Sequence, residues 1–174
     1  MIIRKANLND VKGIATVHVE SWRTTYKGIM PQPYLDGLNV EQREQIWINN
    51  LNNADQDIFV AENDQGEIIG FTSAGQRDTT TEENTTDLTT LYLLEPYHGQ
   101  GIGKALLKAV VEAIQARGFT KINVEVIHEN KTRLFYEKFG AQYVKTVKIS
   151  VYRQPIDEDI YIWTDLNTLL QKLN

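Results

Sequence analysis

The sequence predicts an α/β protein in which strands and helices alternate within one domain. Runs rich in β-branched and aromatic residues recur from the first residues to Trp163, and amphipathic helical patterns lie between several of them. The clearest unit is a strand over 88–94, a glycine-dense loop, a helix from Ile102 and a strand over 121–127. With 174 residues, 41% of them hydrophobic, the chain is long enough for one core. We therefore expect a single domain over residues 1–174.

Composition excludes several classes of function. The chain has no cysteine, so it holds no disulfide framework, thiolate nucleophile or cysteine-based zinc site. Its histidines do not form a ligand spacing, and we predict no metal. A net charge of -5 argues against nucleic-acid binding and mildly favours cationic acceptors. No run approaches the length of a membrane span and no apolar signal core opens the chain, so we expect a cytoplasmic protein with no membrane partner.

The first expected elements are a strand over 1–6 and a helix that begins after a capping box. Asn7 and Asp10 form this box, and the helix places His18 within an apolar stripe. We interpret His18 as a packed structural residue. After Pro31 and Pro33 break the chain, a second helix is expected from Asn39 to about residue 51.

The end of the first helix carries an aromatic pair. Trp22 and Tyr26 are one turn apart and Arg23 projects beside them. Two interpretations stay open at this point. The pair belongs to the core with a solvated arginine, or the three residues border a binding site.

The remaining elements follow in order. A hairpin is expected over 58–74 around the turn 63–66, then a polar surface loop over 78–85. After Gly140 the runs 143–152 and 159–163 are expected as two strands separated by residues 154–157. A short amphipathic helix over 166–173 ends the protein.

The loop between the strand over 88–94 and the helix from Ile102 favours an anion. Gly99, Gly101 and Gly103 leave little side-chain bulk, and the loop delivers backbone N–H groups to a helix N-terminus. A dinucleotide fingerprint fails here because it needs G-x-G-x-x-G. A P-loop also fails, because it needs four residues between its glycines and a hydroxyl residue where Ala105 stands.

A third pattern fits this region. The run His98-x-x-Gly101-x-Gly103 resembles the Q/R-x-x-G-x-G/A loop of the GNAT superfamily of N-acetyltransferases, which in that family binds the pyrophosphate of acetyl-CoA. The preceding segment 91–93 is similar to the family's L-Y-V strand, which pairs with the pantetheine arm. The segment 130–141 is similar to its N-x-x-A-x-x-F-Y-E-K-x-G-F motif.

Three positions depart from the family pattern. His98 replaces Gln or Arg, and Ala141 replaces an aromatic residue. Asn130 lies six residues before Tyr136 rather than the commoner seven. The resemblance implies a GNAT-type mixed, mostly antiparallel central sheet with helices on both faces, in the order β-α-α-β-β-β-α-β-α-β-β.

The resemblance also assigns roles. Acetyl-CoA is the expected cosubstrate, and its expected contacts are Leu91, Tyr92, Leu93, His98, Gly99, Gln100, Gly101, Ile102, Gly103, Lys104 and Asn130. The connection after the first helix overhangs the acceptor site in the family, so Trp22, Arg23 and Tyr26 become candidate acceptor contacts.

Tyr136 and Asp87 are the candidate catalytic residues. Tyr136 stands where the family places its general acid for the departing thiolate. Asp87 is the candidate base, because even spacing would place it on one strand face with Leu91, and Glu20 and Glu125 are its rivals.

The expected function is transfer of an acetyl group from acetyl-CoA directly to an amine of a small molecule. Two alternatives stay open: acetylation of a protein N-terminus or lysine, and a CoA-binding sensor without catalysis. A homodimer is also left open.

Overall fold

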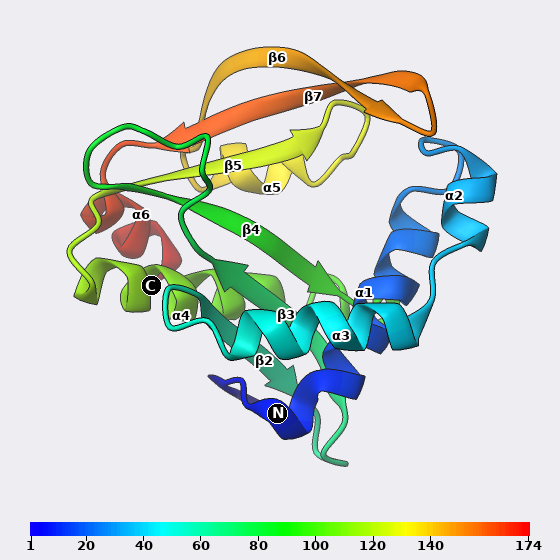
Figure 1. Cartoon of the computed structure of the whole chain (residues 1–174). Coiled ribbons are helices and arrows are strands. Elements are labelled where there is room, and N and C mark those ends of the chain that lie inside the picture. The colour runs from blue at the N-terminus through cyan, green and yellow to red at the C-terminus, as the bar shows by residue number, and fades with distance from the viewer.

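The structure is a computed structural model that describes all residues from Met1 to Asn174, and it is organised around one seven-stranded sheet (Figure 1). The strand order is β1-β2-β3-β4-β5-β7-β6. The bounds are β1 Ile2–Lys5, β2 Asp57–Glu62, β3 Ile68–Ala74, β4 Thr85–Leu93, β5 Lys121–Ile127, β6 Gln142–Val151 and β7 Gln154–Trp163. Only β4 and β5 pair in parallel, which confirms the expected mixed, mostly antiparallel sheet.

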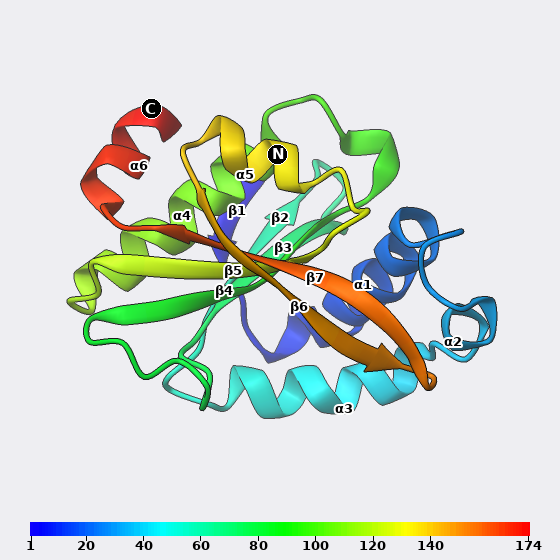
Figure 2. The ribbon, with the colours of Figure 1, turned by 90° about the horizontal axis from the view of Figure 1, so that it is seen from above.

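Helices cover both faces of the sheet, as expected (Figure 2). One face carries α1 Val11–Thr25, α2 Gln32–Asp36 and α3 Val40–Leu51. The other carries α4 Ile102–Ala116, α5 Arg133–Lys138 and α6 Leu166–Leu173. Short 3-10 turns, η1 Leu8–Asp10 and η2 Glu95–Tyr97, precede α1 and α4. No helix has the length and apolarity needed to cross a membrane.

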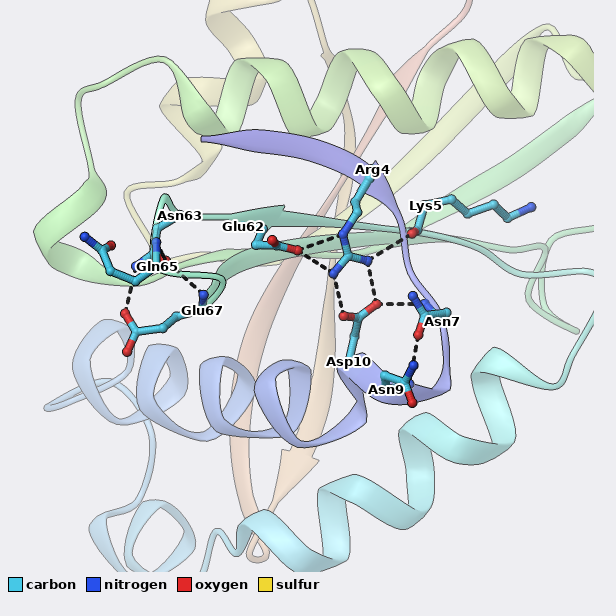
Figure 3. Close-up of polar contacts among 9 residues, drawn as sticks. All are labelled: Arg4, Lys5, Asn7, Asn9, Asp10, Glu62, Asn63, Gln65 and Glu67. Carbon is cyan, nitrogen blue, oxygen red and sulfur yellow. Dashed lines mark hydrogen bonds and ion pairs between the residues drawn. The ribbon is translucent and has the colours of Figure 1, made fainter.

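The expected capping box is present at the start of the helical segment, where it joins a wider polar network (Figure 3). The Asp10 carboxylate accepts a hydrogen bond from the Asn7 N–H at 2.8 Å and two from the Arg4 guanidinium at 2.7 and 2.8 Å. Arg4 also donates to Glu62 at 2.6 and 2.8 Å, so the network joins β1, η1 and β2. The hydrogen bonds from Arg4 lower the pKa of the buried Asp10 below its usual value.

Two sequence-based expectations of the fold were wrong. Residues 154–157 do not separate the last strands, because β7 already begins at Gln154. The turn instead lies at Tyr152 and Arg153, whose φ angles of 50° and 62° form a tight two-residue connection. Pro155 is tolerated because it pairs with β6 only, while the ladder to β5 starts at Glu158. The segment at Pro33 also forms the short helix α2, with proline in its first turn.

The centre of the sheet opens between its two parallel strands. β4 and β5 pair only from Thr85 and Lys121 to Leu88 and Val124. β4 continues to Leu93 with β3 on one side and no strand on the other. The two strands therefore part at their carboxyl ends and leave one edge of β4 unpaired.

Candidate active site

A cavity of about 480 Å³ occupies the opening between β4 and β5. Residues 88–93 of β4 and 124–126 of β5 form its walls. The glycine loop and the start of α4 close one end, and α1 contributes Ser21, Thr25 and Tyr26 at the other. Residues of α5 and of the turn before it line the side. Segments far apart in the sequence therefore converge on one elongated space.

The glycine loop forms the anion-binding end of this cavity. Gly99 and Gly101 have φ angles of 75° and 81°, a conformation that favours glycine. None of the backbone N–H groups from residue 99 to 104 donates a hydrogen bond to another protein group. The same residues lead into the N-terminus of α4, where the helix dipole is positive. Free donors and a positive dipole end make this loop suited to a phosphate group.

The side chain of His98 supports the glycine loop. Its Nε2 atom forms a hydrogen bond of 2.8 Å with the carbonyl oxygen of Leu93, the last residue of β4. The bond ties the start of the loop to the end of the strand. The imidazole therefore acts on the backbone, and the replacement of Gln or Arg by His leaves the loop's N–H groups available.

Tyr136 brings a free hydroxyl to the cavity. The residue is 5% exposed, and its ring packs edge-on against Phe135 and Trp163 with centroid distances of 5.7 Å. Tyr136 lines the cavity, and none of the side-chain hydrogen bonds in the protein involves its hydroxyl. Burial, and then the neighbouring Tyr26, raises the pKa of Tyr136. The phenol thus keeps its proton at neutral pH and can donate a hydrogen bond to a bound group.

The far end of the cavity is polar. Ser21 and Thr25 are four residues apart, so they lie on one face of α1, and both line the cavity. Ser21 is buried, and its hydroxyl has no hydrogen-bond partner. Glu125 is the one carboxylate among the lining residues, and it forms an ion pair with Arg77. This end therefore offers hydroxyl and carboxylate groups, whereas the loop end offers backbone donors.

Most of the predicted cofactor contacts come together around the cavity. Every one of them lines it except Gln100, whose side-chain amide instead donates to the carbonyl oxygen of Pro96 at 3.1 Å. Among the candidate acceptor residues, Tyr26 lines the cavity and Trp22 and Arg23 do not. Arg23 donates to the carbonyl oxygens of Leu35 and Leu38, which fixes α1 against α2.

Asp87 lies outside the cavity. Its buried carboxylate accepts hydrogen bonds of 2.9 Å from the Arg77 N–H and from the Thr80 hydroxyl. The expected even spacing from Asp87 to Leu91 does not hold, because the register with β3 shifts between Ser73 and Ala74. The assignment of Asp87 as base stays a prediction, and this geometry gives the residue a role in anchoring the loop after β3.

His18 is packed, as interpreted from its apolar stripe. Its Nδ1 atom accepts a hydrogen bond of 3.2 Å from the Trp47 indole, and its ring stacks on Tyr92 at 5.3 Å. Burial, with a smaller contribution from Arg43, lowers the pKa of His18 to about 4. The imidazole is therefore neutral at physiological pH and supports the wall of the cavity.

Sequence reasoning missed the hydroxyls of α1. Ser21 and Thr25 carry a signal that could have found them, since two small polar residues at a spacing of four sit beside an apolar stripe. Thr89 and Thr90 also line the cavity, and no feature of the strand pattern distinguishes them. Glu125 was named only as a rival of Asp87, and the sequence does not show that the sheet opens beside it.

Comparisons with known proteins agree with this geometry. The family model described as Acetyltransferase (GNAT) family matches residues 19–141. The uncharacterized N-acetyltransferase YuaI of Bacillus subtilis is 36% identical over 172 residues, which cover 99% of this chain and 98% of that protein. A spermidine N(1)-acetyltransferase of Thermoplasma acidophilum is 25% identical over 143 residues, covering 79% of this chain and 86% of that protein.

A solved structure shows the same arrangement. It is the PaiA N-acetyltransferase from Thermoplasma acidophilum in complex with coenzyme A, with a TM-score of 0.72 and 25% identity. The similarity covers 90% of this chain and 96% of the other. Family match, relatives and fold point the same way. The chain belongs to the GNAT family of acetyltransferases and is an enzyme of the N-acetyltransferase class.

Proposed function

We propose that this protein transfers the acetyl group of acetyl-CoA directly to an amine of a small molecule. One observation carries the proposal. A single cavity joins the unpaired backbone donors of residues 99–104 to the free hydroxyl of Tyr136 and to a polar end at Ser21 and Glu125. The three parts suit the phosphates, the thioester and the amine of such a reaction in that order.

The residues present fit acetyl-CoA. The loop donors would hold the pyrophosphate, as the comparison with a CoA-bound relative supports. The unpaired edge of β4 from Leu91 to Leu93 would pair with the amides of the pantetheine arm. Asn130 also lines the cavity. Bound in this way, acetyl-CoA supplies an activated acetyl group next to Tyr136.

Tyr136 would stabilise the departing sulfur by a hydrogen bond. An ordinary phenol, with a pKa near 10, is already a weaker acid than a thiol near 8.5, and the difference costs about 2 kcal/mol for full proton transfer. Because burial raises the pKa of Tyr136, this cost grows. Hydrogen-bond donation to the sulfur is therefore favoured over transfer of the proton.

Glu125 is the better placed of the candidate bases. An alkylamine with a pKa near 10.4 is mostly protonated at neutral pH, and its deprotonation adds roughly 4.6 kcal/mol to the barrier. Glu125 lines the cavity, whereas Asp87 does not and Glu20 is exposed on α1. We therefore propose that Glu125, directly or through a water, accepts the proton of the amine.

Contacts around the far, polar end of the cavity, where Ser21, Thr25 and Glu125 lie, support a small-molecule acceptor over a polypeptide. The tip of the β6–β7 hairpin lies beside α2, where the rings of Tyr152 and Tyr34 meet with centroids 5.6 Å apart (Figures 1 and 2). The loop after β3 is held over β5 by the Arg77–Glu125 and Lys121–Glu82 ion pairs. An extended peptide needs an open groove, whereas the Arg77–Glu125 ion pair ties the loop after β3 to the cavity wall. The name of the spermidine-acetylating relative points the same way.

An acceptor screen tests the proposal. Purified protein is first shown by calorimetry to bind acetyl-CoA, and release of free CoA is then followed with small amines and with peptides. We expect small amines to be acetylated and Tyr136→Phe to lower kcat by about ten- to a thousandfold while leaving acetyl-CoA affinity nearly unchanged. Tyr143→Phe, at a residue 57% exposed and outside the cavity, is the matched control and should keep full activity. Peptide acetylation without small-amine acetylation would contradict the proposal.

A further inference from the structure

Glu125 reaches the cavity with one charged partner. It lines the cavity, and its carboxylate forms an ion pair with the Arg77 guanidinium of the loop after β3. Strand pairing brings no second partner to this carboxylate. β4 pairs with β5 only as far as Leu88 and Val124, and the residue opposite Glu125 on β7 is Ile160. The orientation and the charge of this carboxylate therefore depend on Arg77.

The other charges on this face of the sheet lie farther from Glu125. Glu158 on β7 is its diagonal neighbour at about 7–8 Å, and the charge of Arg77 acts on that carboxylate as well. Lys145 on β6 is exposed and two strands away, at about 10 Å, and Lys121 is four residues along β5, at about 13 Å. The remaining titratable groups nearby are neutral or exposed: Tyr26 of α1, whose pKa burial raises, and Asp78, Glu82 and Glu83 of the loop. Arg77 is therefore the nearest positive charge to Glu125.

The main chain of the loop holds Arg77 in place. Its N–H donates to the buried Asp87 carboxylate at 2.9 Å, and its carbonyl oxygen accepts a hydrogen bond of 2.9 Å from the Thr80 N–H. The Thr80 hydroxyl donates to the other oxygen of Asp87, and farther along the loop Glu82 pairs with Lys121 of β5. A side chain that projects from a fixed main chain loses less entropy when it forms a contact. The loop thus presents the guanidinium to Glu125 from a preorganised position.

We propose that Arg77 is a positioning residue for the acetyl transfer: its guanidinium fixes the orientation of the Glu125 carboxylate at the cavity and holds it in the charged form that accepts a proton. This inference rests on the proposed function, with Glu125 as the base. In the step that it serves, the amine nitrogen bonds to the acetyl carbon, and the carbon–sulfur bond breaks with its electron pair left on sulfur. One proton passes from the nitrogen to Glu125, directly or through a water. Arg77 keeps its own protons throughout.

The acidic limb of the kcat/KM profile tests this role, because a merely structural contact would not move it. In Arg77→Ala the limb should move to higher pH by about one unit, since the nearest positive charge is lost while Glu158 remains. We expect the lower end of the usual effect of an arginine on a carboxylate, because the two side chains are 31% and 27% exposed. Above the limb, kcat/KM should fall by about ten- to a hundredfold, because the base is no longer oriented. Acetyl-CoA affinity should stay unchanged, since Arg77 does not line the cavity.

The rates are measured by CoA release with butylamine and with the small amine that the acceptor screen ranks first. A second measurement needs no turnover: ¹³C NMR of the side-chain carboxyl groups follows the titration of Glu125, which Glu125→Gln assigns. Its midpoint should also move to higher pH by about one unit in Arg77→Ala. Arg77→Gln, which keeps most of the side chain's length, replaces Arg77→Ala if that variant does not fold.

Two further variants separate charge from loop position. Arg77→Lys keeps the positive charge and should return the limb to its wild-type position, with only part of the rate, because an ammonium lacks the planar fork of a guanidinium. Glu82→Gln is the matched control: it breaks the other ion pair of the same loop, with Lys121, and leaves Arg77 in place. It should keep the wild-type limb. A limb that moves as far in Glu82→Gln as in Arg77→Ala would assign the effect to the loop and overturn the inference.

The outcomes distinguish this inference from the proposed function. If CoA is released and neither the limb nor the Glu125 titration moves in Arg77→Ala, acetyl transfer stands and the role of Arg77 is overturned. A limb in Arg77→Lys that stays where alanine leaves it overturns the role in the same way. If the Glu125 titration moves while the limb does not, Arg77 sets the charge of a residue that is not the base, and the inference falls. If acetyl-CoA binds and no amine releases CoA, the proposed function fails and this inference fails with it.

Discussion

The side-chain amide of Asn130 donates a hydrogen bond of 3.3 Å to the hydroxyl of Tyr26. Both residues are buried in the cavity wall, although 104 positions separate them in the sequence. The carbonyl oxygen of the same amide accepts a hydrogen bond of 2.9 Å from the Thr132 N–H, immediately before α5. Asn130 therefore fastens the end of α1 to the turn that positions the helix of Tyr136.

Removal of this amide should destabilise the protein. We expect Asn130→Ala to lower the free energy of unfolding by about 1–3 kcal/mol, because it leaves the Tyr26 hydroxyl and the Thr132 N–H short of partners. Tyr26→Phe should cost less, because the Thr132 bond remains. Urea unfolding of both single variants and the double variant measures the coupling between them. Additive effects of the two substitutions would show that the hydrogen bond between Asn130 and Tyr26 contributes nothing to the free energy of unfolding.

Two glycines with the same backbone conformation separate cofactor binding from backbone strain. Gly101 in the loop and Gly66 in the β2–β3 hairpin both have a φ of 81°, and an added Cβ would meet no atom within 4 Å at either. Valine at either position should cost a similar amount of stability, on the order of 1–2 kcal/mol or more. Only Gly101→Val should weaken acetyl-CoA binding, by about tenfold or more, because its side chain blocks the free N–H groups. Calorimetry on the two folded variants compares them, and equal affinities would remove the loop from the phosphate site.

Local patterns predicted much of this fold. The start of the helix at Ile102 and the strand over 121–127 were predicted as observed, because a helical apolar period and a run rich in β-branched residues are properties of adjacent residues. The turn at Tyr152 and Arg153 could not be predicted in this way. Neither residue has glycine's freedom at positive φ, and the fold imposes that conformation on them.

The site was less predictable than the fold. The resemblance placed nearly all of the expected cofactor contacts around the cavity, because they lie on one continuous strand–loop–helix unit. The candidate base depended on alternation along β4, which the irregularity opposite Ser73 and Ala74 interrupts. The pairing of Glu125 with Arg77 joins β5 to the loop after β3, and no short-range pattern predicts it.

The ion pair of Asp10 with Arg4 should make the free energy of unfolding depend on pH in the acidic range. Hydrogen bonds from Arg4 lower the folded-state pKa of Asp10 below its unfolded value of about 3.9, so the carboxylate stabilises the fold above that pH. This contribution is lost as the pH falls through the folded-state pKa. Asp10→Asn should therefore cost about 1–3 kcal/mol at pH 7 and flatten the loss of stability below about pH 4. Chemical unfolding between pH 3 and 7 compares the two proteins, and parallel curves would contradict the prediction.

The last prediction concerns the two candidate bases, Glu125 and Asp87, which isosteric amides distinguish. If Glu125 accepts the proton of the amine, Glu125→Gln should remove the acidic limb of the kcat/KM profile. The loss of kcat/KM in Glu125→Gln should become smaller at higher pH, because more of the acceptor amine is already neutral. Asp87→Asn should behave differently, because that carboxylate accepts hydrogen bonds from Arg77 and Thr80 and lies outside the cavity. It should disturb the loop after β3 and lower activity by a factor that does not change with pH. Rates of CoA release from pH 6 to 10 with one acceptor decide between them. A lost acidic limb in Asp87→Asn, with the limb intact in Glu125→Gln, would reverse the assignment.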